Sequence, residues 1–427
     1  MHPNALLDLA AELLRALLKF DAPADGVVAA FFRKHRALGT RERHTLTETA
    51  YAVLRQRLLF QHLARSDGDP SAAGGGGALE RRLAMLAWQG SESFLRGALT
   101  PSEQRWLAEA GRVDRQTLPD KLRHNLPDWL AGQLQERLCD AFWPLVQALD
   151  EPAPLDLRVN VIKARREEVQ RTLAEAGVAC EPTPFSPWGL RVNGKPVLTR
   201  HPGFLAGAFE VQDEGSQLLA LLTDPKRGEM VVDFCAGAGG KTLALGAGMR
   251  NTGRLYAFDT SGHRLDALKP RLARSGLSNV HPAQIAHERD ERIKRLAGKI
   301  DRVLIDAPCS GLGTLRRNPD LKWRQSPKRV AELQATQGAI LASASRLLKP
   351  GGRLVYATCS LLAAENEDVA QAFTEAHAAE FEPVPVLQVL QAARVEQAER
   401  LVEGPFLRLW PHLHRTDGFF AAIWQRR

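Results

Sequence analysis

The sequence predicts an α/β protein: a doubly wound, Rossmann-like domain in the C-terminal half, preceded by an all-α domain and a small mixed α/β region. Three observations predict this order. Apolar residues recur at helical spacing near the N-terminus, short strand-like runs among prolines follow, and β-branched runs then alternate with helical ones. We therefore expect domains at residues 1–115, 116–205 and 206–427.

Composition narrows the class of protein. The chain has 427 residues, 44% of them hydrophobic and 25% charged, which suits a folded protein of several domains. Its net charge of +8 weakly favours a polyanionic partner. The five cysteines are scattered and form no C-x-x-C pair, so the sequence predicts neither a zinc site nor a disulfide framework. We expect a cytoplasmic monomer that binds no metal.

The start of the chain is rich in Ala and Leu, as signal sequences are. Asp8, Glu12, Arg15 and Lys19 nevertheless recur three or four residues apart, which predicts the polar face of an amphipathic helix. Elsewhere no apolar run reaches the roughly 18 residues that would cross a bilayer, so we expect no membrane span.

The all-α domain is expected to consist of amphipathic helices, with the glycine run at 74–77 as a flexible loop. The expected helices lie near residues 4–19, 25–37, 42–66 and 78–90. In the mixed region, Val159 lies in a strand-like run, and a helix near 165–176 ends at Gly177.

The C-terminal domain alternates strands and helices, which predicts a parallel sheet with helices on both faces. The expected strands are 230–235, 254–259, 301–306 and 353–358, and the helices between them include one near 328–348. Ligands of such sheets bind at the carboxyl ends of the strands. Cys235, Asp259, Asp306 and Cys359 each end or closely follow one of these strands, so we expect them near one site.

The glycine-rich segment from Asp233 to Thr242 predicts a ligand loop between a strand and a helix. A Walker phosphate loop would need glycine in place of Cys235, and a dinucleotide loop would need glycine in place of Thr242. A nucleoside site without a pyrophosphate remains. Asp259, at the end of the next strand, suits the ribose hydroxyls of such a ligand, although a tight turn and a solvated aspartate would give the same pattern.

Two cysteines occupy similar places past two strand ends. Cys309 follows the strand that ends at Asp306, and Cys359 follows the next strand. A lone cysteine is most often a small buried apolar residue. A pair at the ligand edge favours covalent catalysis, in which a thiolate adds to carbon 6 of a cytosine ring and makes carbon 5 nucleophilic. A base must then remove the proton from carbon 5 before the thiol leaves.

A basic stretch follows the first of these cysteines. Arg316, Arg317, Lys322 and Arg324 surround Trp323, a pattern typical of contact with a phosphate backbone and a stacked base. A solvated loop with Trp323 tucked into the core would have the same composition.

Several segments together resemble the Sun/Nop family of RNA cytosine-5 methyltransferases, in the bacterial ribosomal RNA branch that carries a NusB-like helical domain. The segments are residues 211–217, 235–242, 306–311, 317–320, 356–360, 365–366 and 417–420. The resemblance covers nearly the whole chain and is strongest from Val211 to Asp368. It implies S-adenosylmethionine as cofactor, cytosine in RNA as the acceptor, and small-subunit ribosomal RNA as the leading substrate.

The resemblance also implies roles for individual residues. Cys359 would be the nucleophile, and Cys309 would help to release the product. Asp306 would bond the edge of the cytosine ring, and Lys241 would lie near the reacting groups. The implied cofactor contacts are Cys235, Ala236, Gly237, Ala238, Gly239, Gly240, Lys241, Asp259, Asp290 and Asp306. The expected RNA contacts are Arg158, Asn160, Arg316, Arg317, Lys322, Trp323 and Arg324.

The cofactor loop departs from the family pattern at two positions. The family usually has Cys-Ala-Ala-Pro-Gly-Gly-Lys-Thr, whereas Gly237 and Ala238 stand here in place of Ala and Pro. Losing the proline frees the loop by roughly 0.4–1 kcal/mol of unfolded-chain entropy. No side-chain contact is removed, so we expect a looser loop and the same reaction.

Other functions fit parts of the sequence. A non-catalytic RNA-binding ribosome-assembly factor on the same fold would need no thiols, and a nucleotide-dependent oxidoreductase would need the complete glycine pattern. DNA cytosine-5 methyltransferases use a Pro-Cys cysteine and lack the second one, so the presence of both Cys309 and Cys359 favours RNA. Turnover of the cofactor separates the assembly factor from an enzyme.

Overall fold

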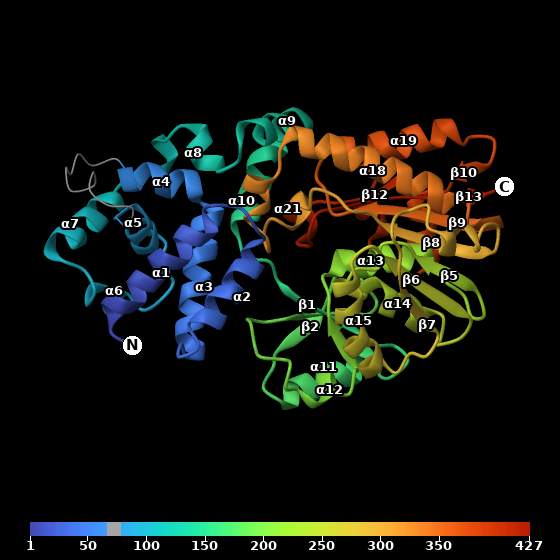
Figure 1. Ribbon diagram of the computed structural model, residues 1–427, viewed down its shortest axis with the longest axis horizontal. Helices are drawn as coiled ribbons and strands as arrows, with labels where there is room; N and C mark the ends of the chain where they lie inside the picture. Colours follow the sequence, from blue (N-terminus) through green and yellow to red (C-terminus); the bar gives the residue numbers. More distant parts are fainter. Residues whose placement is uncertain (66–77) are drawn as a thin grey trace. The chain divides into compact units, whose positions relative to one another are not determined.

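The computed structural model describes residues 1–65 and 78–427, so the glycine run at 74–77 lies outside the described residues. The chain forms two compact units, and Figure 1 labels most of their elements. The first unit contains Met1–Glu151 and Leu315–Ser326, and the second contains Pro152–Thr314 and Pro327–Arg427. The chain thus leaves the second unit after Thr314 and returns to it at Pro327.

The first unit is built from helices. In the first of them Leu6, Leu13 and Leu17 are buried at helical spacing, which gives the helix one apolar face. The helices are α1 (Pro3–Leu17), α2 (Ala24–Lys34), α3 (Thr40–Arg55), α4 (Arg57–Arg65), α5 (Ala78–Leu86), α6 (Glu92–Arg96), α7 (Pro101–Ala110), α8 (Asp120–His124), α9 (Asp128–Leu138), α10 (Phe142–Asp150) and α17 (Leu321–Arg324), with 3-10 turns at Arg115–Thr117 and Cys139–Ala141.

The helices expected near 4–19, 25–37 and 78–90 are confirmed as α1, α2 and α5. The single helix expected at 42–66 is wrong, because it is two helices, α3 and α4, that break at Gln56. Among the described residues, no helix has both the length and the apolar character needed to cross a bilayer.

The all-helical part continues beyond the expected boundary at residue 115. Helices follow one another to Asp150, and the first strand begins at Leu155. These additional helices are short, and α8 and α9 begin directly after Pro119 and Pro127. Prolines at such close spacing interrupt the apolar periodicity, so the sequence pattern alone suggests a mixed region.

A small antiparallel sheet opens the second unit, with strand order β2-β3-β1-β4. Its elements are β1 (Leu155–Val159), β2 (Cys180–Pro182), β3 (Gly189–Val192), β4 (Phe209–Val211), α11 (Arg166–Glu175) and α12 (Pro202–Leu205). Leu157, Leu190 and Phe209 pack with Leu173 of α11 in a core of their own. Because β4 pairs with β1, this sheet extends past the expected boundary at residue 205.

The large sheet has the order β11-β12-β13-β9-β8-β5-β6-β7, with β10 paired to β13. Its strands are β5 (Met230–Asp233), β6 (Arg254–Asp259), β7 (Val280–Gln284), β8 (Ile300–Asp306), β9 (Leu348–Thr358), β10 (Phe381–Pro383), β11 (Val402–Glu403), β12 (Phe406–Leu409) and β13 (Phe419–Arg426). Strands β5 to β9 pair in parallel, as the sequence predicts.

The expectation of a wholly parallel sheet is wrong at the C-terminal end. There β13 pairs antiparallel with both β9 and β12, so the sheet is mixed. Only the short helix α21 (Pro411–His414) separates β12 from β13. A parallel crossover needs a longer connection, so the two strands pair in antiparallel fashion.

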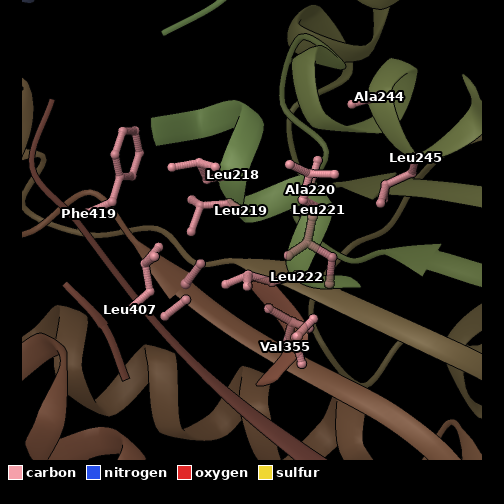
Figure 2. Packing of buried hydrophobic residues seen from close by; sticks show 14 of the residues in the cluster. Leu218, Leu219, Ala220, Leu221, Leu222, Ala244, Leu245, Val355, Leu407 and Phe419 are labelled. Carbon is pink, nitrogen blue, oxygen red and sulfur yellow. The ribbon is translucent and has the colours of Figure 1, made fainter. Parts of the chain in front are cut away.

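Helices cover both faces of the large sheet. They are α13 (Glu214–Thr223), α14 (Gly240–Gly248), α15 (Gly262–Ser275), α16 (Glu291–Lys294), α18 (Pro327–Ser345), α19 (Glu367–Ala376) and α20 (Val386–Ala392). Val231 and Val355 join the core under α13 and α14, part of which Figure 2 shows, while Val232, Ile305 and Leu354 join the core under α18 and α19. The central strands are therefore buried on both faces, as parallel strands require.

Candidate functional site

A cavity of about 740 Å³ opens at the carboxyl ends of the parallel strands. Strands β5, β6 and β8 end at Asp233, Asp259 and Asp306, and all three aspartates line the cavity. Cys309 and Cys359 line it as well. The strand-end residues singled out in the sequence therefore meet at one site. The volume lies in the range that holds a nucleoside cofactor and part of a second ligand.

The glycine-rich loop between β5 and α14 forms one wall of this cavity. Gly237 and Gly239 have φ angles of 55° and 83°, in the left-handed region that favours glycine. A Cβ on Gly239 would lie 2.1 Å from Cδ1 of Leu268, so only glycine fits there. At Ala238, where the similar family has proline, the carbonyl accepts a hydrogen bond of 2.7 Å from Nη1 of Arg271. This bond ties the loop to helix α15.

Asp259 is held by the backbone on both sides of its carboxylate. Oδ2 accepts a hydrogen bond of 2.8 Å from the N–H of Gly237, and Oδ1 accepts one of 2.7 Å from the N–H of Ser261. The side chain is 7% exposed, and each oxygen keeps a second lone pair. This arrangement suits an acceptor for two neighbouring hydroxyls.

Asp290 is not part of the cavity wall, which corrects the expectation that it contacts the cofactor. Its carboxylate caps α16 instead, accepting hydrogen bonds from the N–H groups of Ala286 at 3.0 Å and Arg292 at 2.9 Å. These bonds hold the pKa of Asp290 below its ordinary value. His287 and Glu288 line the cavity in this region. No periodicity or spacing in the sequence distinguishes them from a solvated turn.

Replacing Asp259 by alanine should weaken the binding of S-adenosylmethionine at least tenfold, about 1.4 kcal/mol. The reason is that the variant loses a strand-end carboxylate that backbone N–H groups orient through both of its oxygens. Calorimetric titration measures the change. Asp290→Ala is the matched control, and it should keep wild-type affinity because its carboxylate caps a helix. Equal affinities for wild type and Asp259→Ala would remove Asp259 from the cofactor site.

The two thiols face each other across the cavity edge. Sγ of Cys309 lies 3.4 Å from Sγ of Cys359, and both side chains are half-buried. The carbonyl of Cys359 accepts a hydrogen bond of 2.8 Å from the N–H of Gly313, which joins the two cysteine loops through the backbone. The hydrogen bond to Cys359, burial and the nearby charge of Glu365 raise the pKa of the Cys309 thiol well above its ordinary value. These surroundings favour the protonated form of Cys309.

Lys241 and Asp306 form an ion pair beside the thiols. Nζ of Lys241, in the first turn of α14, lies 2.7 Å from Oδ2 of Asp306. Burial opposes the charge of Lys241, but Asp306 and Cys359 outweigh it, so the pKa of Lys241 is raised. The ring of Phe419 lies 5.8 Å from the same nitrogen. The cavity therefore contains a positive charge that is paired with Asp306 and close enough to Cys359 to be affected by it.

Sequence reasoning assigned no role to two further parts of the cavity wall. Gln212 and Ser216 line it from the segment between β4 and α13. Leu333, Thr336 and Ile340 line it from α18. The first pair falls within the 211–217 segment of the family resemblance, which was a usable signal. The α18 residues carry no such signal, because they reach the cavity only through helix packing.

Arg158 and Asn160 are buried within the second unit, with 2% and 5% of their surface exposed. Nε of Arg158 donates to Oε1 of Gln212 at 2.6 Å. Nδ2 of Asn160 donates to the carbonyls of Gly207 at 2.9 Å and Ser275 at 3.0 Å. These internal bonds correct the expectation that the two side chains meet RNA directly. They join the small sheet to the large domain.

The basic stretch lies in the first unit and packs on its helices. Nζ of Lys322 donates to the carbonyl of Arg55 at 2.7 Å, and Nε1 of Trp323 donates to the carbonyl of Leu54 at 3.0 Å. Lys322 is 5% exposed, and burial lowers its pKa to about 8. Arg316 is equally buried. Lys322 and Trp323 therefore pack against the helices of the first unit, which was the alternative to RNA contact. Direct contact between Lys322 and RNA is not supported.

Two family models match the chain. The model described as 16S rRNA methyltransferase RsmB/F matches residues 220–425, which span the cavity. The model described as the ferredoxin-like domain of RsmF/B-like methyltransferases matches residues 126–198, which include strands β1, β2 and β3.

Individual proteins agree with these models. "Probable ribosomal RNA small subunit methyltransferase B" of Synechocystis sp. is 30% identical over 97% of this chain and 98% of its own length. "Ribosomal RNA small subunit methyltransferase B" of Serratia proteamaculans is 33% identical over 70% of this chain and 66% of its own. The crystal structure of a methyltransferase homologue from Pyrococcus horikoshii, at 29% identity, covers 74% of this chain and 100% of that one with a TM-score of 0.62. Because the similarity runs through both the small sheet and the cavity-bearing domain, the chain belongs to the RsmB/F family of 16S rRNA methyltransferases.

Proposed function

We propose that this enzyme methylates carbon 5 of a cytosine in small-subunit ribosomal RNA, with S-adenosylmethionine as methyl donor and Cys359 as covalent nucleophile. The observation that carries the proposal is the pair of thiols 3.4 Å apart at the cavity. Methyl transfer to a nitrogen or a hydroxyl needs no thiol, whereas carbon 5 becomes nucleophilic once a thiolate adds to carbon 6. Membership of the family supports ribosomal RNA as the substrate.

The residues at the strand ends fit S-adenosylmethionine. Asp259 offers a lone pair on each carboxylate oxygen to the ribose hydroxyls. Ile285, Leu333 and Ile340 add apolar surface to the cavity, which suits the flat adenine ring. The glycine loop lets the backbone come close to the ligand. When bound, the cofactor supplies an electrophilic methyl group.

The chain's own residues prepare the cytosine for this group. Cys359 adds as a thiolate to carbon 6, which moves electron density to carbon 5. The carboxyl group of Asp306 bonds the edge of the ring at N3, and Lys241 keeps a positive charge beside it. After transfer a base takes the proton from carbon 5, and the bond between carbon 6 and sulfur breaks. Cys309, next to the attacking sulfur, assists this last step.

The target cytosine has to leave its stack so that carbon 6 reaches the thiol at the cavity. We further propose that the helical unit is a NusB-like domain, since its elements are helices. The protein would act as a monomer in the cytoplasm, where its ribosomal substrate lies.

Nucleoside analysis of the RNA product tests the function. The full-length protein is incubated with transcribed, unmodified 16S ribosomal RNA and methyl-labelled S-adenosylmethionine, and the digested RNA is analysed by mass spectrometry. The expected result is label in 5-methylcytidine. Label in any other nucleoside would overturn the carbon-5 assignment. RNA binding without cofactor consumption would favour a non-catalytic assembly factor.

The basic stretch leaves Arg317 and Arg324, both half-buried, as its best candidates for RNA contact. Replacing both with alanine should weaken RNA binding and lower the slope of log affinity against log salt by roughly one per lost phosphate contact. Lys322→Met is the matched control and should keep the wild-type slope, because Lys322 is buried in the helical unit. Fluorescence anisotropy at several salt concentrations measures the slopes. Equal slopes for all three proteins would mean that the stretch only packs against helices.

A further inference from the structure

A buried glutamate connects the two cysteine loops without lining the cavity. Glu365 closes the 3-10 turn Ala363–Glu365 after β9 and is 0% exposed. The residues that it contacts, rather than the cavity, relate Glu365 to the two thiols. The segment 365–366 belongs to the family resemblance, but the reaction proposed above uses neither of its residues.

The carboxylate of Glu365 is held by donors from both loops. Oε1 accepts hydrogen bonds from the N–H of Ser310 at 2.7 Å and from Nε2 of Gln337 at 3.1 Å. Oε2 accepts from the hydroxyls of Ser310 and Ser360. Ser310 directly follows Cys309, and Ser360 directly follows Cys359. One carboxylate therefore fixes the residues next to both reacting sulfur atoms.

A second layer of hydrogen bonds fixes the glutamate itself. The carbonyl of Glu365 accepts from the hydroxyl of Tyr356 at 2.6 Å. Nδ2 of Asn366 donates to the carbonyl of Ser360 at 3.0 Å. On the other side, Nε2 of Gln337 also donates to the carbonyl of Pro308 at 2.9 Å. The network thus spans strand β9, helix α18 and both cysteine loops.

A purely structural role would not need a charge at this position. Burying a carboxylate is costly even when it is fully hydrogen-bonded, and an apolar side chain of similar volume often packs with greater stability. Glu365 accepts donors from the two loops that carry the thiols, and its charge acts on Cys309. Its surroundings therefore favour a role in the reaction over a role in the core.

We propose that Glu365 is a positioning residue whose carboxylate holds the Cys309 and Cys359 loops at the spacing that covalent methyl transfer requires. This inference rests on the proposed function, since it assigns the thiols their part in the reaction. The negative charge adds a second effect. The bond to Cys359 and burial raise the pKa of Cys309, and the charge of Glu365 adds to this, which favours the protonated thiol at Cys309.

The test compares Glu365→Ala and Glu365→Gln with Glu214→Gln. Glu214 is the matched control: it is 0% exposed, it does not line the cavity, and it accepts hydrogen bonds from the N–H groups of Phe185 at 2.6 Å and Ser186 at 2.7 Å. Single-turnover methylation of 16S ribosomal RNA gives the rate, RNA titration gives KM, and calorimetry gives the cofactor affinity. Thermal unfolding reports whether each variant folds.

Glu365→Ala should lower kcat about a hundredfold with KM and cofactor affinity unchanged, because misplaced reacting groups cost rate rather than binding. Glu365→Gln should recover about a tenth of the wild-type rate, since the hydroxyls of Ser310 and Ser360 can turn to accept from the amide. It should also shift the basic limb of the pH–rate profile to lower pH, because the charge that raises the pKa of Cys309 is gone. Glu214→Gln should lose stability but keep the wild-type profile.

Wild-type activity is measured first, which separates this inference from the proposed function. If the wild type forms no 5-methylcytidine, both fail together. If it does, and Glu365→Gln keeps the wild-type rate and pH profile, only the role of Glu365 is overturned. The same follows if Glu214→Gln reproduces the kinetic changes, since these would then reflect general loss of structure. Should Glu365→Ala not fold, the pH profile of Glu365→Gln decides.

Discussion

Replacement of Cys359 by alanine should lower the rate of methyl transfer to RNA by roughly a thousandfold or more and leave the fold intact. In the proposed mechanism, the thiolate that activates carbon 5 comes from this residue. Cys309 is the nearest alternative, 3.4 Å away, but its pKa is raised well above the ordinary value, so it remains a poor nucleophile. The loss of one half-buried sulfur atom costs about 1 kcal/mol of stability.

Transfer of labelled methyl groups to 16S ribosomal RNA measures this loss, and calorimetric titration with S-adenosylmethionine shows that the cofactor site survives. Cys180→Ala is the matched control, because Cys180 is also half-buried but lies in the small sheet. It should keep wild-type activity. Methyl transfer by Cys359→Ala at more than about a tenth of the wild-type rate would show that another group attacks the ring.

Strand ends are the part of the site that sequence patterns predict best. The strand expected at 254–259 is β6 with the same bounds, and the one expected at 301–306 is β8, one residue longer. The last residues of parallel strands lie at the same edge of the sheet. Asp259 and Asp306 could therefore be assigned to one site from the sequence alone. Cys309 and Cys359 follow from the same rule.

Contacts between distant segments could not be predicted in this way. The family resemblance suggested that Arg158 meets RNA, and the basic stretch around Trp323 suggested the same for Lys322, since charged residues are normally exposed. Their partners, Gln212 and the carbonyl of Arg55, lie 54 and 267 residues away in the chain. The prediction that Asp290 contacts the cofactor was wrong for a local reason. An acidic residue that caps a short helix and one that faces a ligand can stand in the same sequence surroundings.

Replacement of Cys309 by alanine should have a different effect: methyl transfer occurs, but the enzyme stays bonded to its product. Cys359 is still present and can attack carbon 6. Without the neighbouring thiol, the last step of the reaction is slow, so the bond between carbon 6 and sulfur persists. The expected kinetics are a burst of about one methyl group per enzyme followed by a slow phase.

The trapped species should appear as a slow band on a denaturing gel that nuclease destroys, with the mass of the protein plus a methylated RNA fragment. The matched control is Cys309→Ala combined with Cys359→Ala, which should give no band because the attacking sulfur is absent. Cys180→Ala should behave as wild type, since its thiol lies outside the cavity.

Two other outcomes would contradict the proposed mechanism itself, and not only the expected size of the effect. A band with Cys359→Ala, and none with Cys309→Ala, would reverse the roles of the thiols and make Cys309 the nucleophile, as in DNA cytosine-5 methyltransferases. The raised pKa of Cys309 argues against this order, because a thiol that holds its proton is the poorer attacker. If neither variant alters transfer to RNA, the reaction does not pass through a bond to sulfur, and the 3.4 Å contact between the thiols serves the fold alone.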